Sequence, residues 1–582
     1  MSELLKKYSK LDNICSELKE QKLLEIGQSV LLGFDEDLKS SQEWLDEVKK
    51  VEELVSLVSK KKTRPLPNSA NIKYPLITKA CYEFSSRTYP EIIRDGKVVK
   101  GMVIGKDLEV DDNGDGKKYA QSNRVCAYMN YQLLTESQDW ELELDRLLNQ
   151  LALVGFICKK TYYDPIRDKI KSEICEYKDL IINSSVKCLT DTPRISHIIR
   201  VRLNDLIEAS RSDVFSDTPV KKLIKQHELN ILNPEIELIE QHTYCDLDED
   251  GYQEPYIITI VKSSGDVLRI APRYTSKMIK MKGDRVRYID ALHFFTDYHF
   301  LVSPKGKFQS VGFGILMLHL NETINTLMNQ LTDAGQLANM QGGYIDARLK
   351  EIEGDGSDRA PGEWQRLKAM AGVTLREGVL PIQYKEPSNV LFQMLGLVIQ
   401  ASKELSSSTE AMTGAGSPEN VKSGAVMAMI DQSLKLFTSI QNRIYRSLSQ
   451  EYRKIFRLNS IYLDPQKYVN VVDDQLAVFQ EDFDESKVDI IPIADPNLSS
   501  ESQRIARYQI LLQLISLPGL KPDMVTRRLI QALNIPNSQE LLVSEQEKAN
   551  QPPPIEVIKM QQEMEGHANE LELKNREIDL KE

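Results

Sequence analysis

Apolar side chains recur every three or four positions along several long stretches of this sequence, a spacing that predicts amphipathic helices. The longest stretch begins near Ser423 and continues to Arg457 without a proline. Its apolar positions are Val426, Met429, Ile430, Leu434, Phe437, Ile440, Ile444, Leu448, Tyr452 and Ile455. Another apolar stretch at 388–408 precedes it, and a small, polar segment with two glycines at 409–423 separates the two. We therefore predict two long helices that present an exposed, flexible loop from a rigid mount.

The same spacing predicts helices elsewhere in the chain. Residues 1–60 are expected to be helical, and 311–340 forms another long amphipathic pattern. The polar side of this second pattern repeats at four-residue steps, with Asn321, Asn325, Asn329 and Asp333. Shorter helices are predicted from Pro75 to Tyr89, over 118–134 and 140–159, from a capping box at 500–503, over 523–533 and over 555–582.

Alternating apolar and polar positions predict strands within the first 300 residues. The clearest region is 236–274, which reads as three strands, with an acidic turn at 246–251 after the first. Two short strands are expected around Gly96, and further strands over 156–163 and 175–182. The predicted fold class is therefore α+β.

Composition narrows the classes of function. A chain of 582 residues is long enough for several domains and a sizeable core. Its net charge of -12 excludes a generic basic nucleic-acid binder, so any contact with DNA must be local or deliberately weak. The seven cysteines form no CxxC pair, which predicts reduced thiols in a cytosolic setting. We expect no signal peptide and no transmembrane helix, because no sufficiently long apolar run is present.

Two acidic turns, Asp111–Gly116 and Asp246–Gly251, match the start of a calcium-binding loop. Both lack the glutamate that closes such a loop, because the twelfth position is Ser122 in one and Ile257 in the other. We interpret both as acidic hairpin turns and predict no metal and no cofactor.

Catalytic patterns are also missing from the sequence. The histidines show no metal-ligand spacing, and packing is the preferred interpretation of His293 and His299 among their aromatic neighbours. No GxSxG elbow or Walker A loop occurs, and no carboxylate pair stands out as an acid and a base. We predict that the protein is not an enzyme.

Several short motifs, taken in their order, resemble portal proteins of tailed bacteriophages, especially those of the short-tailed, podovirus-like type. The motifs are Gly312-Phe-Gly314, Leu320–Asn325, Asn329–Gly335, Ala338–Gly343, Pro361–Trp364, Tyr384–Ser388 and Thr413–Gly416, with weaker matches at Val154–Tyr163 and Ile493–Asn497. The resemblance covers roughly 65–520.

The resemblance implies a dodecameric ring at the unique capsid vertex of the virion, assembled in the host cytoplasm, through which double-stranded DNA is packaged and ejected. It implies a portal fold with an α/β wing, a long-helix stem, a small clip insert, a tunnel loop and a helical crown. The corresponding segments are an N-terminal helical part of the wing at 1–64, the wing at 65–310, stem helices at 311–340 and 386–408, the clip at 341–385, the tunnel loop at 409–423, a long helix returning to the wing at 424–499, the crown at 500–548 and a helical tail at 549–582.

Binding residues follow from these assignments. The tunnel loop would line the DNA channel with Thr413, Gly414, Gly416, Asn420 and Lys422. Lys422 is hypothesised to make one transient phosphate contact; the alternative is a lysine that merely lies near a helix start. The clip would bind the large terminase subunit and tail adaptor proteins through Arg348, Lys350, Trp364, Arg366, Lys368 and Arg376. The alternatives are an ordinary charged surface and, for Trp364, a packing anchor.

The expected partners are therefore eleven further copies of the chain, DNA, the major capsid protein, terminase and tail adaptors, with no membrane. Two other classes stay open at this point. A scaffolding or coiled-coil assembly protein of the virion would form elongated dimers instead of a closed ring. A packaging enzyme would need an ATP-binding loop or an acidic metal cluster.

Overall fold

The computed structural model describes most of the first 496 residues, which form one compact unit; the second unit, 497–582, lies outside the described residues. The described residues are 2–57, 69–94, 96–104, 117–164, 167–227, 235–283, 285–339, 343–345, 350–351, 367–368, 379–381, 386–405, 423–473, 479–484 and 488–493. The predicted crown and C-terminal tail are therefore outside them.

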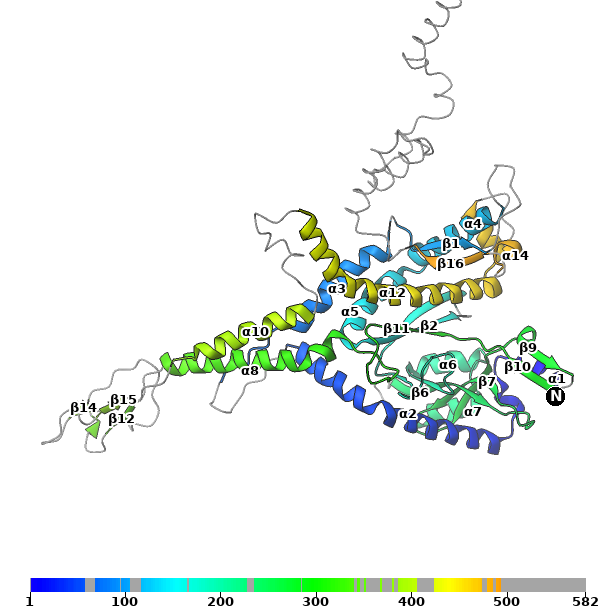
Figure 1. Ribbon diagram of the computed structural model, residues 1–582. Coiled ribbons are helices and arrows are strands. Elements are labelled where there is room, and N and C mark those ends of the chain that lie inside the picture. The colour runs from blue at the N-terminus through cyan, green and yellow to red at the C-terminus, as the bar shows by residue number, and fades with distance from the viewer. Residues whose placement is uncertain are drawn as a thin grey trace, which may run out of the picture. The chain divides into compact units, whose positions relative to one another are not determined.

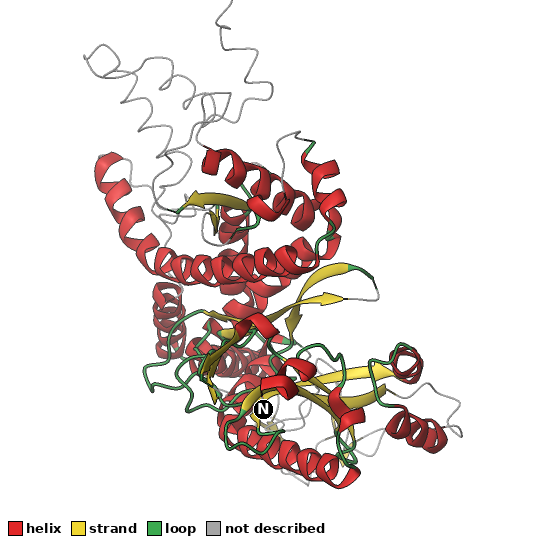
Figure 2. Ribbon diagram, turned by 90° about the vertical axis from the view of Figure 1, so that its right-hand side faces the viewer, coloured by secondary structure: helices red, strands yellow, loops and turns green. Residues whose placement is uncertain are grey.

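Helices and strands alternate irregularly along the first unit (Figures 1 and 2). The helices are α1 (Ser2–Tyr8), η1 (Ile14–Glu17), α2 (Glu20–Val55), α3 (Leu76–Ile92), α4 (Lys117–Tyr131), η2 (Gln132–Glu136), α5 (Gln138–Val154), α6 (Leu203–Arg211), α7 (Asp217–His227), η3 (Ser276–Met278), α8 (Phe313–Asn339), α10 (Asn389–Leu405), α12 (Ser423–Tyr462), α13 (Pro465–Val472) and α14 (Phe479–Asp482). The strands are β1 (Val99–Val103), β2 (Phe156–Asp164), β3 (Lys169–Cys175), β4 (Leu180–Ile181), β5 (Ile195–Arg202), β6 (Glu235–Cys245), β7 (Glu254–Val261), β8 (Val267–Pro272), β9 (Ile279–Lys282), β10 (Arg285–Ile289), β11 (Phe295–His299), β12 (Gly343–Ile345), β13 (Lys350–Glu351), β14 (Leu367–Lys368), β15 (Val379–Pro381) and β16 (Val488–Pro492). The α+β fold class predicted from the sequence is confirmed.

Two antiparallel sheets make up most of the strand content. The larger has the order β4-β5-β6-β7-β8, and the smaller has the order β11-β2-β3. Helix α2 packs against the larger sheet, and α12 lies across the smaller one (Figure 1). None of the helices in the described ranges is long and apolar enough to cross a membrane.

The predicted apolar face of α12 is confirmed where its side chains are described. Phe437, Ile440, Ile444, Leu448, Tyr452 and Ile455 are almost completely buried. They belong to one apolar cluster with side chains from α3, α4, α5 and α8. Because each fully buried side chain of this size contributes roughly 1.5–3 kcal/mol, this face fixes α12 on the rest of the unit.

A polar ladder joins α8 to the extended segment 69–74. The Oδ1 atoms of Asp333, Asn329 and Asn325 accept hydrogen bonds from the backbone N–H groups of Ala70, Ile72 and Tyr74 at 2.6, 2.6 and 2.7 Å. Helical residues four apart lie on one side, and alternate residues of an extended chain also face one way, so the two repeats match. The regular polar side seen in the sequence therefore has a structural role.

Three local predictions differ from the structure. Two strands were expected around Gly96, but only β1, after the glycine, forms. Because α3 extends to Ile92, the segment between α3 and Gly96 is too short to form a second strand. Arg94 and Lys97 form only an isolated bridge, and β1 pairs instead with β16. This pairing joins segments more than 380 residues apart, which no local pattern could reveal.

The helix expected over 140–159 ends at Val154. Gly155 follows with φ of +96°, the left-handed conformation that closes many helices. A Cβ atom at Gly155 would lie 2.2 Å from the backbone N of Gly312, so the close approach of α5 to the start of α8 also requires glycine.

The strand expected over 175–182 is displaced toward the N-terminus. It is β3, which ends at Cys175 and pairs with β2, whereas Leu180 and Ile181 form the short β4 in the other sheet. Lys169, Lys171 and Glu173 make β3 more polar than a typical strand, which is why the apolar pattern missed it.

Candidate functional site

Helices α8 and α10 pack against each other, and the chain between them is the insert that the sequence assigns to the clip (Figure 1). Leu395, Val398 and Ile399 on one side of α10 join the apolar cluster that contains Ile324 of α8. The paired helices thus form a rigid mount for the insert.

The remaining side of α10 is also apolar but faces outward. Val390, Phe392 and Leu397 are 70%, 68% and 67% exposed, and Met394 is 48% exposed. Contiguous exposed apolar patches often mark surfaces at which a protein binds another protein. Val390, Met394 and Leu397 follow a four-and-three spacing that puts them on one side of the helix, whereas Phe392, two positions after Val390, lies on another side. The outward side defined by Val390, Met394 and Leu397 is called the α10 apolar face below.

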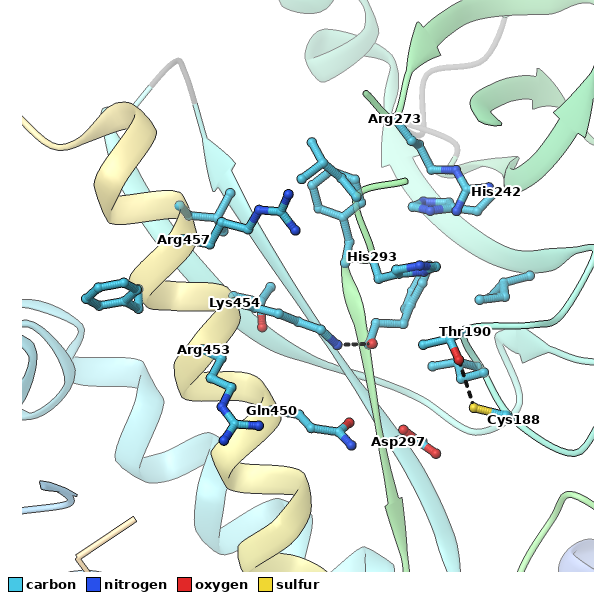
Figure 3. Close-up of a pocket in the computed structure, with 18 of the residues that line it drawn as sticks. Cys188, Thr190, His242, Arg273, His293, Asp297, Gln450, Arg453, Lys454 and Arg457 are labelled. Carbon is cyan, nitrogen blue, oxygen red and sulfur yellow. Dashed lines mark hydrogen bonds between the residues drawn. The ribbon is translucent and has the colours of Figure 1, made fainter. Parts of the chain in front are cut away.

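A cavity of about 490 Å³ lies between α12 and the two sheets (Figure 3). Arg453, Lys454 and Arg457 of α12 line one wall. His242 of β6, Asp297 of β11 and Arg273, which directly follows β8, line others. The contacts of these groups decide what the cavity can do.

Charged groups on the α12 wall are engaged by neighbouring residues. Lys454 Nζ donates to the carbonyl oxygen of Phe295 and to Thr296 Oγ1 at 2.8 Å, and burial lowers the pKa of Lys454 to about 8. The guanidinium of Arg453 donates to both carboxylate oxygens of Asp489 at 2.8 and 2.6 Å. These cations therefore hold α12 to β11 and β16.

On the opposite wall, burial lowers the pKa of His242 and of His293 to about 4, so both rings are neutral at pH 7. His242 Nε2 lies 2.9 Å from Glu240 Oε1, and Arg273 donates to the carbonyl oxygen of Thr243 at 3.3 Å. The cavity is lined by groups that stabilise the packing of the strands.

One chain of hydrogen bonds near the cavity has the composition of a catalytic triad. His299 Nδ1 lies 2.8 Å from Ser310 Oγ, and its Nε2 lies 2.9 Å from Asp297 Oδ2. Ser310 is 2% exposed, so its hydroxyl is closed to a substrate. His299 also contacts the rings of Phe156 and Phe308, which supports the packing role expected from the sequence.

Comparison with known proteins decides between the classes left open. The family model of the phage SU10 portal protein matches residues 157–570, more than two thirds of the chain. The chain belongs to this family. No curated protein matches the sequence.

Membership makes the chain a phage portal protein, of a family that is structural rather than enzymatic. It implies an oligomeric protein associated with the capsid of the virion. The match begins in β2 and contains both large sheets, α8, α10 and α12. It favours the portal interpretation over a scaffolding protein.

Most residues predicted to bind partners of the portal protein lie outside the described residues. This holds for the DNA-channel residues Thr413, Gly414, Gly416, Asn420 and Lys422, and for the clip residues Arg348, Trp364, Arg366 and Arg376. Their roles remain predictions.

Two clip residues fall in described strands. Lys350 of β13 and Lys368 of β14 are directly paired in an antiparallel ladder. A second pair, β12 with β15, joins the two ends of the insert by the register Gly343 to Pro381. The described residues of the insert therefore include two short two-stranded sheets. One of them, β13 with β14, pairs two of the predicted partner-binding lysines.

The α10 apolar face was not singled out in the sequence. The three-and-four spacing over 388–408 places Val390 and Met394 on the same apolar face as Leu395 and Val398, but the structure leaves Val390 and Met394 exposed. Leu397 does not fit that spacing and was not recognised. The signal that could have found it is the density of apolar residues: α10 carries them around most of its circumference.

Proposed function

We propose that the protein is the subunit of a dodecameric ring at the unique capsid vertex, the channel through which DNA is packaged and ejected. The observation that carries the proposal is the family membership together with the α10 apolar face on a long helical pair. A ring subunit needs two lateral surfaces that are covered by its neighbours, and an outward apolar helix face supplies one of them.

The structural elements take portal roles in this proposal. Helices α8 and α10 form the stem, and the insert at 341–385 forms the clip. The sheets and helices before residue 311 form the wing, which contacts the major capsid protein. The segment 409–423 forms the tunnel loop, and 500–548 forms the crown.

A neighbouring copy of the chain covers the α10 apolar face. Removing Val390, Met394 and Leu397 from water provides the favourable term for ring closure, at about 25 cal/mol per Å² of apolar surface. The same face would be a liability in a monomer, because exposed apolar patches promote non-specific association.

Charge supports a channel along which DNA slides. Each lysine that neutralises a phosphate adds salt-dependent affinity, and a ring multiplies that affinity by its number of copies. A chain with net charge -12 and a tunnel loop whose charged residues are Glu410, Glu419 and Lys422 avoids tight binding. Lys422 makes the loop's transient phosphate contact.

The clip binds the large terminase subunit during packaging and tail adaptor proteins afterwards. The α8–α10 pair supports this role because it presents the insert at the end of two long helices. The ladder of β13 and β14 pairs Lys350 with Lys368, two of the residues assigned to partner binding, and basic residues suit acidic groups on a partner.

Electron microscopy of the purified full chain tests the proposal. We expect closed rings with an axial hole wide enough for a DNA duplex. Monomers, or rods of the kind that a coiled-coil scaffold forms, at every salt and protein concentration tried would contradict it. Deletion of 341–385 should retain the ring and abolish terminase binding, and terminase binding by the deletion variant would contradict the clip assignment.

A further inference from the structure

The turn between β6 and β7 gathers four carboxylates. Asp246, Asp248 and Asp250 occupy alternate positions of the turn, and Glu254 is the first residue of β7. One carboxylate oxygen from each of the four lies within 4.8 Å of the others. The sequence pattern stopped at the third aspartate, because the position where a calcium loop places its glutamate holds Ile257.

The backbone of the turn holds the aspartates in this arrangement. Asp246 accepts hydrogen bonds from the N–H groups of Asp250 at 3.3 Å and Gly251 at 2.9 Å, and Asp250 accepts one from Tyr252 at 2.8 Å. Gly251 has φ of +88°, which a glycine adopts without strain. Backbone N–H groups of the turn therefore fix the positions of the Asp246 and Asp250 carboxylates.

A buried carboxylate oxygen without a partner provides a second, independent observation. Glu254 is 0% exposed, and its Oε1 accepts no hydrogen bond from the described residues. Its Oε2 has a contact of 3.5 Å with the N–H of Leu247, at the limit for a hydrogen bond. Both carboxylate oxygens of Asp248 are likewise buried without a hydrogen-bond partner among the described residues. Buried carboxylates are expensive unless a cation or a donor compensates them.

A lysine beside the turn is bound to other groups. Lys22 Nζ lies 2.9 Å from Glu249 Oε1 and 2.9 Å from the carbonyl oxygen of Leu247. Burial, followed by the charge of Asp248, raises the pKa of Glu254 to about 7. Burial and the charge of Asp250 also raise the pKa of Asp248. The four carboxylates repel one another in the absence of a positive ion.

We propose that the β6–β7 turn binds a calcium ion through the carboxylates of Asp246, Asp248, Asp250 and Glu254. Ca²⁺ accepts six to eight oxygen ligands in flexible geometry, with backbone carbonyls and water completing the shell. Mg²⁺ requires a near-octahedral arrangement and usually keeps several waters, and Zn²⁺ favours nitrogen and sulfur ligands. An all-carboxylate cluster on a turn of alternating aspartates therefore selects calcium.

The position of the site explains what the ion would do. Leu247 and Tyr256, on either side of the cluster in sequence, belong to the apolar cluster that packs α1 and α2 against the large sheet. The ion would join the turn to the first residue of β7 and so fix the end of the β6–β7 hairpin beside that cluster. This inference does not depend on ring formation or on DNA.

Calorimetric titration of the chelator-treated full chain with CaCl₂, together with thermal unfolding at each calcium concentration, tests the site. We expect one ion per chain and a rise in Tm with calcium. Asp250→Asn, which changes a partly exposed ligand, and Glu254→Gln should weaken binding by at least about tenfold, the loss seen even for residues that only support a metal ligand. Glu235→Gln is the control: it removes one charge from the exposed far end of β6 but leaves the four ligands and the Lys22–Glu249 pair, and it should bind calcium like the parent chain.

The proposal is overturned if the folded parent chain shows no calcium heat up to about 1 mM, the weak end of known protein sites. It is also overturned if Asp250→Asn, verified as folded by circular dichroism, binds calcium as tightly as the parent chain. A titration with MgCl₂ that gives an equal affinity would refute the selection of calcium, whereas weaker magnesium binding supports it.

Discussion

Lys159 of β2 and Glu451 of α12 form an ion pair in which both side chains are completely buried, with Nζ 2.9 Å from Oε1. Glu451 also accepts hydrogen bonds from Ser172 at 2.6 Å, from Trp140 at 3.1 Å and from Tyr298. Burial by itself raises the pKa of Glu451, but the Lys159 ammonium and the hydrogen bonds from Ser172 and Tyr298 hold it below its ordinary value. One carboxylate thus connects α12 with α5, β2, β3 and β11.

Replacing Lys159 by methionine should destabilise the fold by about 3–5 kcal/mol, because it leaves the Glu451 charge buried without its counterion. The double variant Lys159→Met with Glu451→Leu should recover part of the loss, since neither charge then remains. Chemical denaturation followed by circular dichroism measures both. The control is Lys221→Met on α7, whose pair with Asp217 is exposed and should contribute less than about 1 kcal/mol. Equal losses in Lys159→Met and the control would contradict this account.

The ladder on α8 predicts a local effect. Asn329→Ala removes the acceptor of the Ile72 N–H at 2.6 Å and the donor to the Ile72 carbonyl at 3.3 Å. The expected cost is about 1–3 kcal/mol, toward the lower end because Ile72 is 39% exposed and water can replace part of the interaction. Hydrogen exchange measured on a peptide covering 69–74 should become faster. Thr326→Ala, on the exposed side of α8, should leave that peptide unchanged; an identical change in both variants would refute the ladder.

These two sets of contacts show where sequence reasoning stops. The periodicity of α8 and α12 predicted both helices and the buried face of α12, because a helix face depends on residues close in sequence. The partner of Asn329 is an extended segment 257 residues away, and the partner of Glu451 is a lysine 292 residues away. Neither has a local signature, since a lone lysine in a strand usually predicts an exposed position.

The candidate sites divide in the same way. The acidic turn at 246–251 was visible as a motif, but the fourth carboxylate was missed because a standard calcium loop places its glutamate three residues later than Glu254. The α10 apolar face was missed because apolar residues in a helical pattern were assumed to face the protein core. The tunnel-loop and clip assignments rest on the resemblance to portal proteins, and experiments on DNA passage and terminase binding would test them.

Stability should fall as the pH falls below about 6.5. The pKa of His242 is lowered to about 4, first by burial, with Arg273 and Lys160 adding to the effect and Glu240 opposing it. Between pH 4 and the unfolded value near 6.5 the unfolded chain binds more protons, so protonation favours unfolding. Each pKa unit corresponds to about 1.4 kcal/mol, which gives roughly 3 kcal/mol at the acidic end.

The variant His242→Gln should flatten only part of this pH dependence, because His197 and His293 have the same lowered pKa of about 4. Denaturation midpoints at pH 4.5, 5.5, 6.5 and 7.5, roughly spanning the two pKa values, provide the measurement. His319→Gln is the control, since the His319 side chain is 90% exposed on α8. A parent chain whose stability is unchanged between pH 7.5 and 4.5 would contradict the prediction.

Ring assembly should depend on Leu397. Leu397→Glu places a charge in the α10 apolar face, where the proposed neighbouring subunit would have to bury it, while the separated chain keeps the carboxylate in water. The expected loss is at least about 2 kcal/mol for each subunit interface of the proposed ring, because the charge would be buried without a partner. Light scattering after size-exclusion chromatography should show a shift from rings to single subunits with unchanged circular dichroism. Gln330→Glu adds the same charge at an exposed position of α8, outside the α10 apolar face, and should leave the rings intact. Rings of normal size and salt resistance in Leu397→Glu would mean that another surface joins the subunits, and the assignment of α10 to the subunit contact would have to be abandoned.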